Sequence, residues 1–124
     1  MRREILTEEE ASHVFVEKVV NFFKSPVGRR SALAKKLQKE KSFNILTDYR
    51  GTEVMVQGII DCYFEEEGEL ILLDYKTNYS SEGIEKLYRR QMDLYAEALE
   101  KGEGRYPKET YLYLFSQDRQ VKME

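Results

Sequence analysis

The segment QGIIDCYFEEEGELILLDYKTN, residues 57–78, carries the pattern from which the fold of this chain can be predicted. Apolar or small side chains occupy every second position on its first half and just before it, as in a β-strand with one buried face. The members of this alternating set are Val54, Val56, Gly58, Ile60, Cys62 and Phe64. The sequence EEEG at residues 65–68 predicts a turn, and the apolar residues 70–73 predict a returning strand. We therefore predict a β-hairpin.

Three charged residues of this hairpin are not explained by folding alone. Asp61 follows three apolar or small residues, where an unpaired carboxylate costs free energy. Asp74 and Lys76 are two residues apart, so on a strand both side chains would emerge on one face, with roughly 7 Å between their Cα atoms. The three residues are consistent with a metal site beside a lysine. They are also consistent with a salt bridge between Asp61 and Lys76 and a turn at Asp74.

A metal site of this kind would select a hard cation. Carboxylate and carbonyl oxygens favour Mg²⁺ or Mn²⁺ over softer metals. A cation with two or three protein ligands keeps bound water and lowers the pKa of that water. A neighbouring lysine, such as Lys76, could orient the water or stabilise negative charge on a phosphate.

The composition predicts one soluble domain spanning residues 1–124. Hydrophobic residues make up 41% of the chain and charged residues 35%, which is typical of a globular protein. No segment approaches the roughly 20 apolar residues that a membrane span needs, and no secretory leader opens the chain. The net charge of −3 gives no overall attraction to nucleic acid, so such binding would depend on local basic patches or a bound cation.

The single cysteine narrows the classes of site further. Cys62 cannot form a disulfide within the chain, and one thiol cannot supply a four-cysteine zinc or iron–sulfur site. We expect a reducing, cytoplasmic compartment.

The remaining segments predict two helices before the hairpin and a helix and a strand after it. TEEE at residues 7–10 fits a capping box for a helix that ends near residue 23. Ser25-Pro26 predicts the start of a second helix, and residues 41–47 predict a strand that reaches a turn at residues 49–51. The second helix would bury Val27, Leu33, Ala34 and Leu37.

After the hairpin, Ser80 or Ser81 would cap a helix from about residue 82 to residue 101, with Gly102 as its C-cap. Residues 109–115 predict the last strand and residues 116–124 a polar tail. The predicted order is α-α-β-β-β-α-β, an α/β (α+β) domain with a mixed sheet of about four strands. The helix would bury Ile84, Leu87, Gln91, Leu94, Tyr95 and Ala98.

Three motifs in this order resemble the PD-(D/E)xK nuclease superfamily, with its restriction-endonuclease-like core, in its RecB-like form. They are GIID at residues 58–61, DYKT at residues 74–77 and QMDLY at residues 91–95. Within that family, segments such as ILTEEEA, VEKVVNFFKSPVGRR and YLYLFS make nearly the whole chain similar to the C-terminal nuclease domain of AddA-type subunits of bacterial helicase/nucleases.

The resemblance implies a role for each matching residue. Asp61 and Asp74 match the metal-binding acids, Lys76 matches the catalytic lysine, and the Tyr75 carbonyl would complete the metal shell. Gln91 and Tyr95 lie four residues apart on one helix face and match a pair that contacts substrate or steadies the lysine. Glu40, in QKEKSF, occupies the place of a family glutamate, although the surrounding residues match poorly.

Two family features are missing from this sequence. RecB-like nucleases have a metal-ligand histidine on an earlier helix, and His13 lies beyond that place, so we interpret it as a surface or half-buried side chain. A GxxxxGK[ST] motor motif is also absent. We expect this chain to be a fragment of a longer protein, in which case it could bind metal weakly or cleave poorly.

Basic residues on the two later helices are candidates for DNA contact, although most such residues form a solvated helix face. Tyr75, Tyr79 and Tyr88 could stack on single-stranded bases or pack in the core. The basic candidates are Arg29, Arg30, Lys35, Lys36, Lys86, Arg89 and Arg90.

The resemblance implies a DNA exonuclease domain that depends on Mg²⁺ or Mn²⁺. In its parent protein the domain would trim strands that the helicase motors unwind during double-strand break repair. It would work with an AddB-type subunit in a bacterial cytoplasm. One alternative is a catalytically silent nuclease fold that binds DNA or docks a partner subunit. Another is a stand-alone RecB-like or Cas4-like nuclease. The Cas4 form normally has an iron–sulfur cluster, and the single cysteine counts against it.

Overall fold

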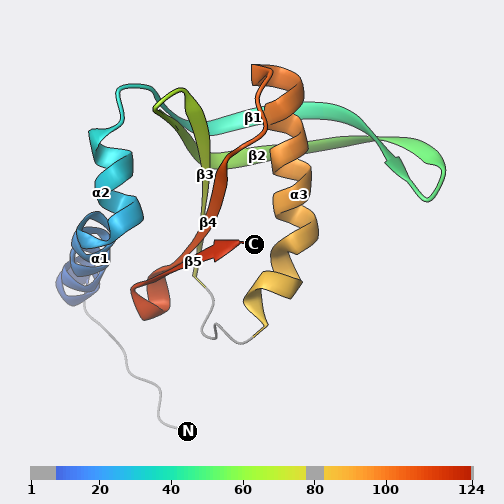
Figure 1. Cartoon of the computed structure of the whole chain (residues 1–124). Helices are drawn as coiled ribbons and strands as arrows, with labels where there is room; N and C mark the ends of the chain where they lie inside the picture. Colours follow the sequence, from blue (N-terminus) through green and yellow to red (C-terminus); the bar gives the residue numbers. More distant parts are fainter. Residues whose placement is uncertain (1–7, 78–82, 124) are drawn as a thin grey trace, which may run out of the picture.

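The computed structural model describes residues 8–77 and 83–123, and the side chains from residue 16 onward. Two helices and three strands precede the gap, and a helix, a 3₁₀ turn and two strands follow it (Figure 1). Four features of the sequence analysis lie outside the described part: the predicted capping box, the Ser80 or Ser81 cap, Tyr79 and the side chain of His13. The elements are α1 (Glu8–Lys24), α2 (Pro26–Leu33), β1 (Leu37–Tyr49), β2 (Thr52–Glu66), β3 (Glu69–Lys76), α3 (Ile84–Glu103), β4 (Glu109–Leu114), η1 (Phe115–Gln117) and β5 (Arg119–Met123).

One mixed sheet of five strands organises the structure. Its order is β1-β2-β3-β4-β5, and all neighbours are antiparallel except β3 and β4. The parallel pair is possible because α3 forms the crossover between these two strands. The predicted α/β fold class is therefore confirmed, with β5 as an additional strand.

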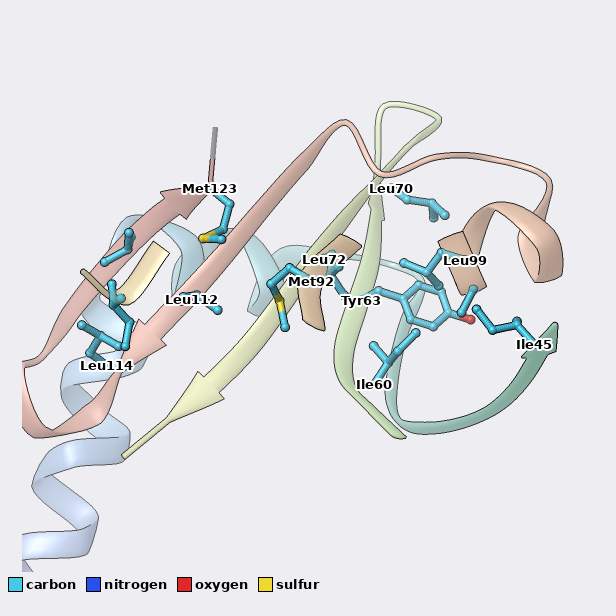
Figure 2. Packing of buried hydrophobic residues seen from close by; sticks show 13 residues of the cluster. Ile45, Ile60, Tyr63, Leu70, Leu72, Met92, Leu99, Leu112, Leu114 and Met123 are labelled. Carbon is cyan, nitrogen blue, oxygen red and sulfur yellow. The ribbon is translucent and has the colours of Figure 1, made fainter. Parts of the chain in front are cut away.

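The sheet is covered on both faces. Helix α3 lies against one face, and α1 and α2 lie against the other (Figure 1). On the α3 side the core is built from aliphatic side chains of β3 and β4 together with Tyr63, Met92 and Leu99 (Figure 2). On the α1 and α2 side, the core includes Phe22, Val27, Cys62, Phe64, Ile71, Leu73, Tyr111 and Tyr113.

Two hairpins share the same turn chemistry. Arg50 and Gly51 connect β1 to β2 with φ angles of 52° and 81°, and Glu67 and Gly68 connect β2 to β3 with φ angles of 53° and 80°. Two positive φ angles in a two-residue loop match the right-handed twist of the flanking strands, and the second position of each loop is a glycine. Both predicted turns are confirmed, and β2 takes part in two hairpins.

The predicted alternation along β2 is wrong at one place. Ile60 packs on the α3 side, whereas Cys62 and Phe64 pack on the opposite side, so the expected single face changes sides at Asp61. The partner strand is distorted at the same level: Glu40, which lies between the paired residues Lys39 and Lys41, has a φ of 52°. A local break in the β1–β2 ladder therefore reorients both strands next to Asp61.

Several predicted boundaries are also corrected. Helix α2 ends at Leu33, which is 83% exposed, and Leu37 belongs to β1. The C-cap of α3 is Gly104, and Leu87 is exposed, whereas Tyr88 packs against the core. The predicted polar tail contains β5, whose Val121 is buried against the sheet. None of the described helices is long and apolar enough to cross a membrane.

An arginine ties α2 to the end of the sheet opposite the candidate site. Arg30 binds Glu66 through two nitrogens at 3.0 and 2.7 Å, Glu109 at 2.6 Å, and the Tyr111 hydroxyl at 3.0 Å. The Arg30 guanidinium, helped by Tyr111 and Lys122, lowers the pKa of Glu109 to about 2. Arg30, predicted as a DNA contact, is thus a structural residue.

We expect Arg30→Met to lower the free energy of unfolding by about 1–2 kcal/mol at pH 7, because two carboxylates lose a charged partner. The folded state lowers the pKa of Glu109, so this stabilisation is complete above the ordinary value of 4.5 and is lost as the pH falls toward 2. Urea unfolding at pH 7 and pH 3 checks this. The exposed neighbour Arg29, as Arg29→Met, should change stability little at either pH.

Candidate active site

The candidate site lies where β2 separates from β3. The β2–β3 ladder includes the pair Cys62 and Leu73 but no pair beyond it toward Asp61. There the side chain of Asp61 replaces the backbone acceptor of the ladder, because its Oδ2 accepts a hydrogen bond of 3.0 Å from the backbone N–H of Tyr75. The break in β2 therefore turns the Asp61 carboxylate toward the strand that carries Asp74 and Lys76.

Asp74 is the most unusual residue of this site. It is 2% exposed, and its pKa is raised to about 6, chiefly by burial and also by the Asp61 carboxylate, with Lys76 opposing the change. Its Oδ2 lies 2.7 Å from Lys76 Nζ, but the pair lacks hydrogen-bond alignment, so this buried oxygen has no hydrogen-bond partner in the described part of the chain. A buried acceptor without a donor is suited to a further ligand.

Lys76 is held from three sides. In addition to Asp74, its Nζ donates a hydrogen bond of 2.7 Å to Gln91 Oε1 and lies 4.0 Å from the centre of the Tyr88 ring. These contacts leave the lysine side chain 13% exposed. The predicted alternative of an Asp61–Lys76 salt bridge is not what the structure shows, because the lysine pairs with Asp74.

Helix α3 supplies the second half of this arrangement. Gln91 Nε2 donates a hydrogen bond of 3.2 Å to the Tyr95 hydroxyl, so the predicted pair on one helix face does meet. Burial, followed by the charges of Asp74 and Asp61, raises the pKa of Tyr95. The hydroxyl therefore stays protonated at neutral pH and can act as a donor.

The glycine of the GIID segment supports α3 indirectly. A Cβ atom at Gly58 would lie 2.7 Å from the ring of Phe43, and that ring packs edge-on against Tyr95 at 5.5 Å between centroids. A side chain at this position would displace Phe43 and hence Tyr95. The glycine therefore permits the packing that places the Gln91–Tyr95 pair over β3.

Glu40 and Tyr75 differ in how they relate to the site. The β1–β2 register places Glu40 opposite Asp61, but Glu40 is exposed and its backbone is left-handed. The Tyr75 ring lies on the other face of the sheet, where it contacts Phe22 and Phe115 and lies beside the Cys62 thiol. Its ring is thus part of the core packing, and its carbonyl group remains a candidate ligand.

The donor set fits a hard divalent cation, although it is small. Asp61 and Asp74 bring two carboxylates into contact, and one buried oxygen of Asp74 has no hydrogen-bond donor. Among the residues that the structure describes, no third acidic, histidine or cysteine side chain joins them. Two carboxylates with a backbone carbonyl would leave coordination positions for water and substrate oxygens.

The candidate DNA-binding residues are spread over both sides of the fold. Lys36 lies 3.6 Å from Glu65 near the β2–β3 turn, and Arg89 lies 3.7 Å from Glu85 on α3. Tyr88 contacts Lys76, a role that we did not predict from the sequence, although the sequence carries a signal for it. The signal for it was spacing: Tyr88, Gln91 and Tyr95 recur three and four residues apart on one face of α3.

The sequence matches the family profile described as the PD-(D/E)XK nuclease superfamily over residues 2–123. The chain belongs to this superfamily. It is also 41% identical to the A subunit of the ATP-dependent helicase/nuclease of Clostridium novyi (strain NT), over 100% of this chain and 11% of that protein. The corresponding protein of Alkaliphilus metalliredigens (strain QYMF) is 45% identical over 97% of this chain, again matching 11% of its own length.

A solved structure shows the same fold at low sequence identity. The crystal structure of SSO0001 superposes with a TM-score of 0.51 and 14% identity, covering 90% of this chain and 50% of that one. At this identity the likeness shows the fold alone. This nuclease domain spans about a tenth of the length of its helicase/nuclease relatives, at 11% in Clostridium novyi (strain NT).

We expect Asp74→Asn to stabilise the metal-free protein by roughly 1–2 kcal/mol at pH 7, since a buried charge is removed and the loss of the Lys76 ion pair offsets part of the gain. The folded state raises the pKa of Asp74 from 3.8 to about 6. The wild-type carboxyl group is therefore protonated in both states well below pH 3.8, and its cost grows as the pH rises from 3.8 to about 6 and is complete above that.

Urea unfolding in EDTA at pH 7 and pH 3.5 measures this difference. The exposed Asp93 on α3, changed to asparagine, is the matched control and should give no pH-dependent gain. Equal stability of wild type and Asp74→Asn at both pH values would contradict the expectation.

Proposed function

We propose that this domain hydrolyses phosphodiester bonds of DNA with the help of a divalent cation, Mg²⁺ or Mn²⁺. The observation that carries the proposal is the buried Asp74 carboxylate, which touches Asp61 and whose Oδ2 has, among the described residues, only the Lys76 ammonium, at 2.7 Å, to compensate its charge. Membership of a nuclease superfamily agrees with this chemistry. Asp61, Asp74 and the Tyr75 carbonyl would hold the cation, and Glu40 is a further candidate at the register position of Asp61.

The cation, when bound, would supply Lewis-acid stabilisation and an acidified water. The chain's own contribution centres on Lys76. An ammonium group has three donors, and Gln91 accepts one of them at 2.7 Å. A second faces Asp74, and the remaining donor can hold the attacking water or a phosphate oxygen and stabilise the charge that develops there. Asp74 keeps the lysine close to the reacting phosphate, and Gln91 with Tyr95 fixes its direction.

The relatives' names extend the proposal to a larger assembly. Proteins named as the A subunit of an ATP-dependent helicase/nuclease contain a segment 41–45% identical to this chain. We infer that residues 1–124 are the nuclease part of such a protein. In the bacterial cytoplasm it would cut strands released by the parent's helicase motors, act in double-strand break repair, and work with an AddB-type subunit.

The alternative is a nuclease fold without activity that binds DNA or docks a partner subunit. One observation favours it: in the described part of the chain, Asp61 and Asp74 are joined by no third ligand side chain. A two-carboxylate site would hold a cation weakly. The two functions differ in whether cleavage depends on Lys76.

The wild-type chain should cleave labelled single-stranded DNA when Mg²⁺ or Mn²⁺ is added, and Lys76→Ala should lower the rate by at least about 100-fold, because the lysine's charge contacts the reacting phosphate. Lys24→Ala, at an exposed lysine on α1, is the matched control and should cleave normally. Calorimetry with Mn²⁺ on wild type and Asp74→Ala separates binding from chemistry. Metal binding without cleavage would favour the catalytically silent nuclease fold, and so would the absence of both metal binding and cleavage.

Tyr88 should act as a positioning residue for Lys76. Tyr88→Leu removes the ring under the ammonium and should lower kcat about tenfold, whereas Tyr88→Phe keeps the ring face and should retain activity. Steady-state kinetics together with thermal unfolding checks this. If both variants lose activity equally, or lose it only in proportion to stability, the cation–π contact is not what positions the lysine.

A further inference from the structure

The tip of the β1–β2 hairpin carries an aromatic ring that two guanidinium groups contact. Tyr49 ends β1, Arg50 lies in the turn, and Arg90 comes from α3. The guanidinium carbons of Arg50 and Arg90 lie 5.2 and 5.5 Å from the centre of the Tyr49 ring. The tyrosine is nevertheless 46% exposed. We call these three residues the Tyr49 cluster.

Helix α3 determines where this cluster lies. Lys101 donates to the carbonyl oxygen of Leu46, Thr47 Oγ1 donates to Glu97 at 3.0 Å, and Arg90 covers Tyr49. The contacts move along α3 toward its N-terminus as β1 approaches its turn. The hairpin, which extends past α3 in Figure 1, is therefore attached to the helix at three levels.

This attachment places the cluster on the same helix that carries Gln91 of the candidate site. Arg90 precedes Gln91, and Gln91 accepts the hydrogen bond of Lys76. Neighbouring Cα atoms are about 3.8 Å apart, so one side of α3 presents the cluster and the adjoining side presents the lysine's partner. A short stretch of polymer chain can contact both.

The guanidinium groups of the cluster form no close ion pair within the described part of the chain. Arg30, Arg89 and Arg105 each lie within ion-pair distance of a glutamate. Arg50 and Arg90, by contrast, form no such pair with any residue in the described ranges, although the charge of Arg90 helps to lower the pKa of Glu97. Both arginines are exposed, and two exposed guanidinium groups at an accessible ring suit a ligand that has regularly spaced anions and flat aromatic groups.

We propose that the Tyr49 cluster is a subsite for single-stranded nucleic acid, which holds nucleotides next to the phosphodiester that lies at Lys76. Arg50 and Arg90 bind phosphates, and Tyr49 stacks on a base. A single strand fits better than a duplex, because its bases expose their faces to an aromatic side chain. The inference rests on the proposed function for the position of the scissile bond, but not for binding itself.

Binding is measured without cleavage, by fluorescence anisotropy of labelled oligothymidylate of about 20 nucleotides in EDTA over a range of salt concentrations. The double variant Arg50→Ala/Arg90→Ala should bind about tenfold more weakly and reduce the slope of log K against log salt by about 1.4, since each lost single-strand phosphate contact removes roughly 0.7. Tyr49→Ala should weaken binding about tenfold with little change in slope, and Tyr49→Phe should bind normally.

Lys24→Ala/Lys108→Ala removes two exposed lysines elsewhere and is the charge-matched control, whose affinity should change less than that of the arginine double variant. Thermal unfolding of each variant shows whether the hairpin is intact. A Tyr49→Ala protein that is less stable, together with an arginine double variant that binds like wild type, would overturn the subsite and leave a structural stacking role. An equal effect of the two double variants would also overturn it.

These outcomes are distinguishable from failure of the proposed hydrolysis. A wild-type chain that binds the oligonucleotide through the cluster but never cleaves it supports the subsite and contradicts the nuclease activity. A chain that cleaves while the cluster variants bind like wild type contradicts the subsite alone. A wild-type chain with no measurable binding to the single strand overturns the subsite.

Discussion

The buried carboxylate of Asp74 is the constraint on which the rest of this structure depends. A charge that is 2% exposed costs free energy unless neighbouring groups compensate for it, and here a lysine two residues along the same strand does so. The lysine in turn needs Gln91 and Tyr88, which fixes the position of α3 against β3. The compensation is incomplete, since burial and Asp61 still raise the pKa of Asp74. Such a cost next to a lysine lowers the stability of the domain and agrees with the chemistry proposed for this site.

The distortion of the β1–β2 hairpin centres on the second carboxylate of the site, Asp61. A regular β2 would keep Ile60 and Cys62 on one face and would continue the β2–β3 ladder past Cys62. Instead the strand changes sides at Asp61, and the Asp61 carboxylate takes the N–H of Tyr75 in place of a backbone acceptor. The hairpin beyond the break then leaves the central sheet and follows α3. One local irregularity thus shapes the site and separates the hairpin tip, which extends past α3, from the central sheet (Figure 1).

The opposite end of the sheet is stabilised in a different way. There Arg30 joins α2 to β2 and β4 through glutamates whose pKa values it lowers, so charged groups stabilise the fold. At the site end, by contrast, Asp74 has its pKa raised because burial outweighs its partner. The folded state therefore lowers the pKa of carboxylates at one end of the sheet and raises the pKa of a carboxylate at the other. In the sequence both ends contain acidic and basic residues in strands and helices, and only the degree of burial distinguishes the two ends.

Local pattern determined much of this protein, because turn chemistry, alternation and helix periodicity act between residues close in the chain. The two hairpins, the three helices and the residues Asp61, Asp74, Lys76, Gln91 and Tyr95 could be predicted in this way, with the family resemblance. The tertiary structure alone decided the change of faces at Asp61, the strand β5 and the contact of Tyr88 with Lys76. It also decided that Arg30 is structural. These depend on burial and on partners distant in sequence, and no local pattern encodes which distant groups will share a buried charge.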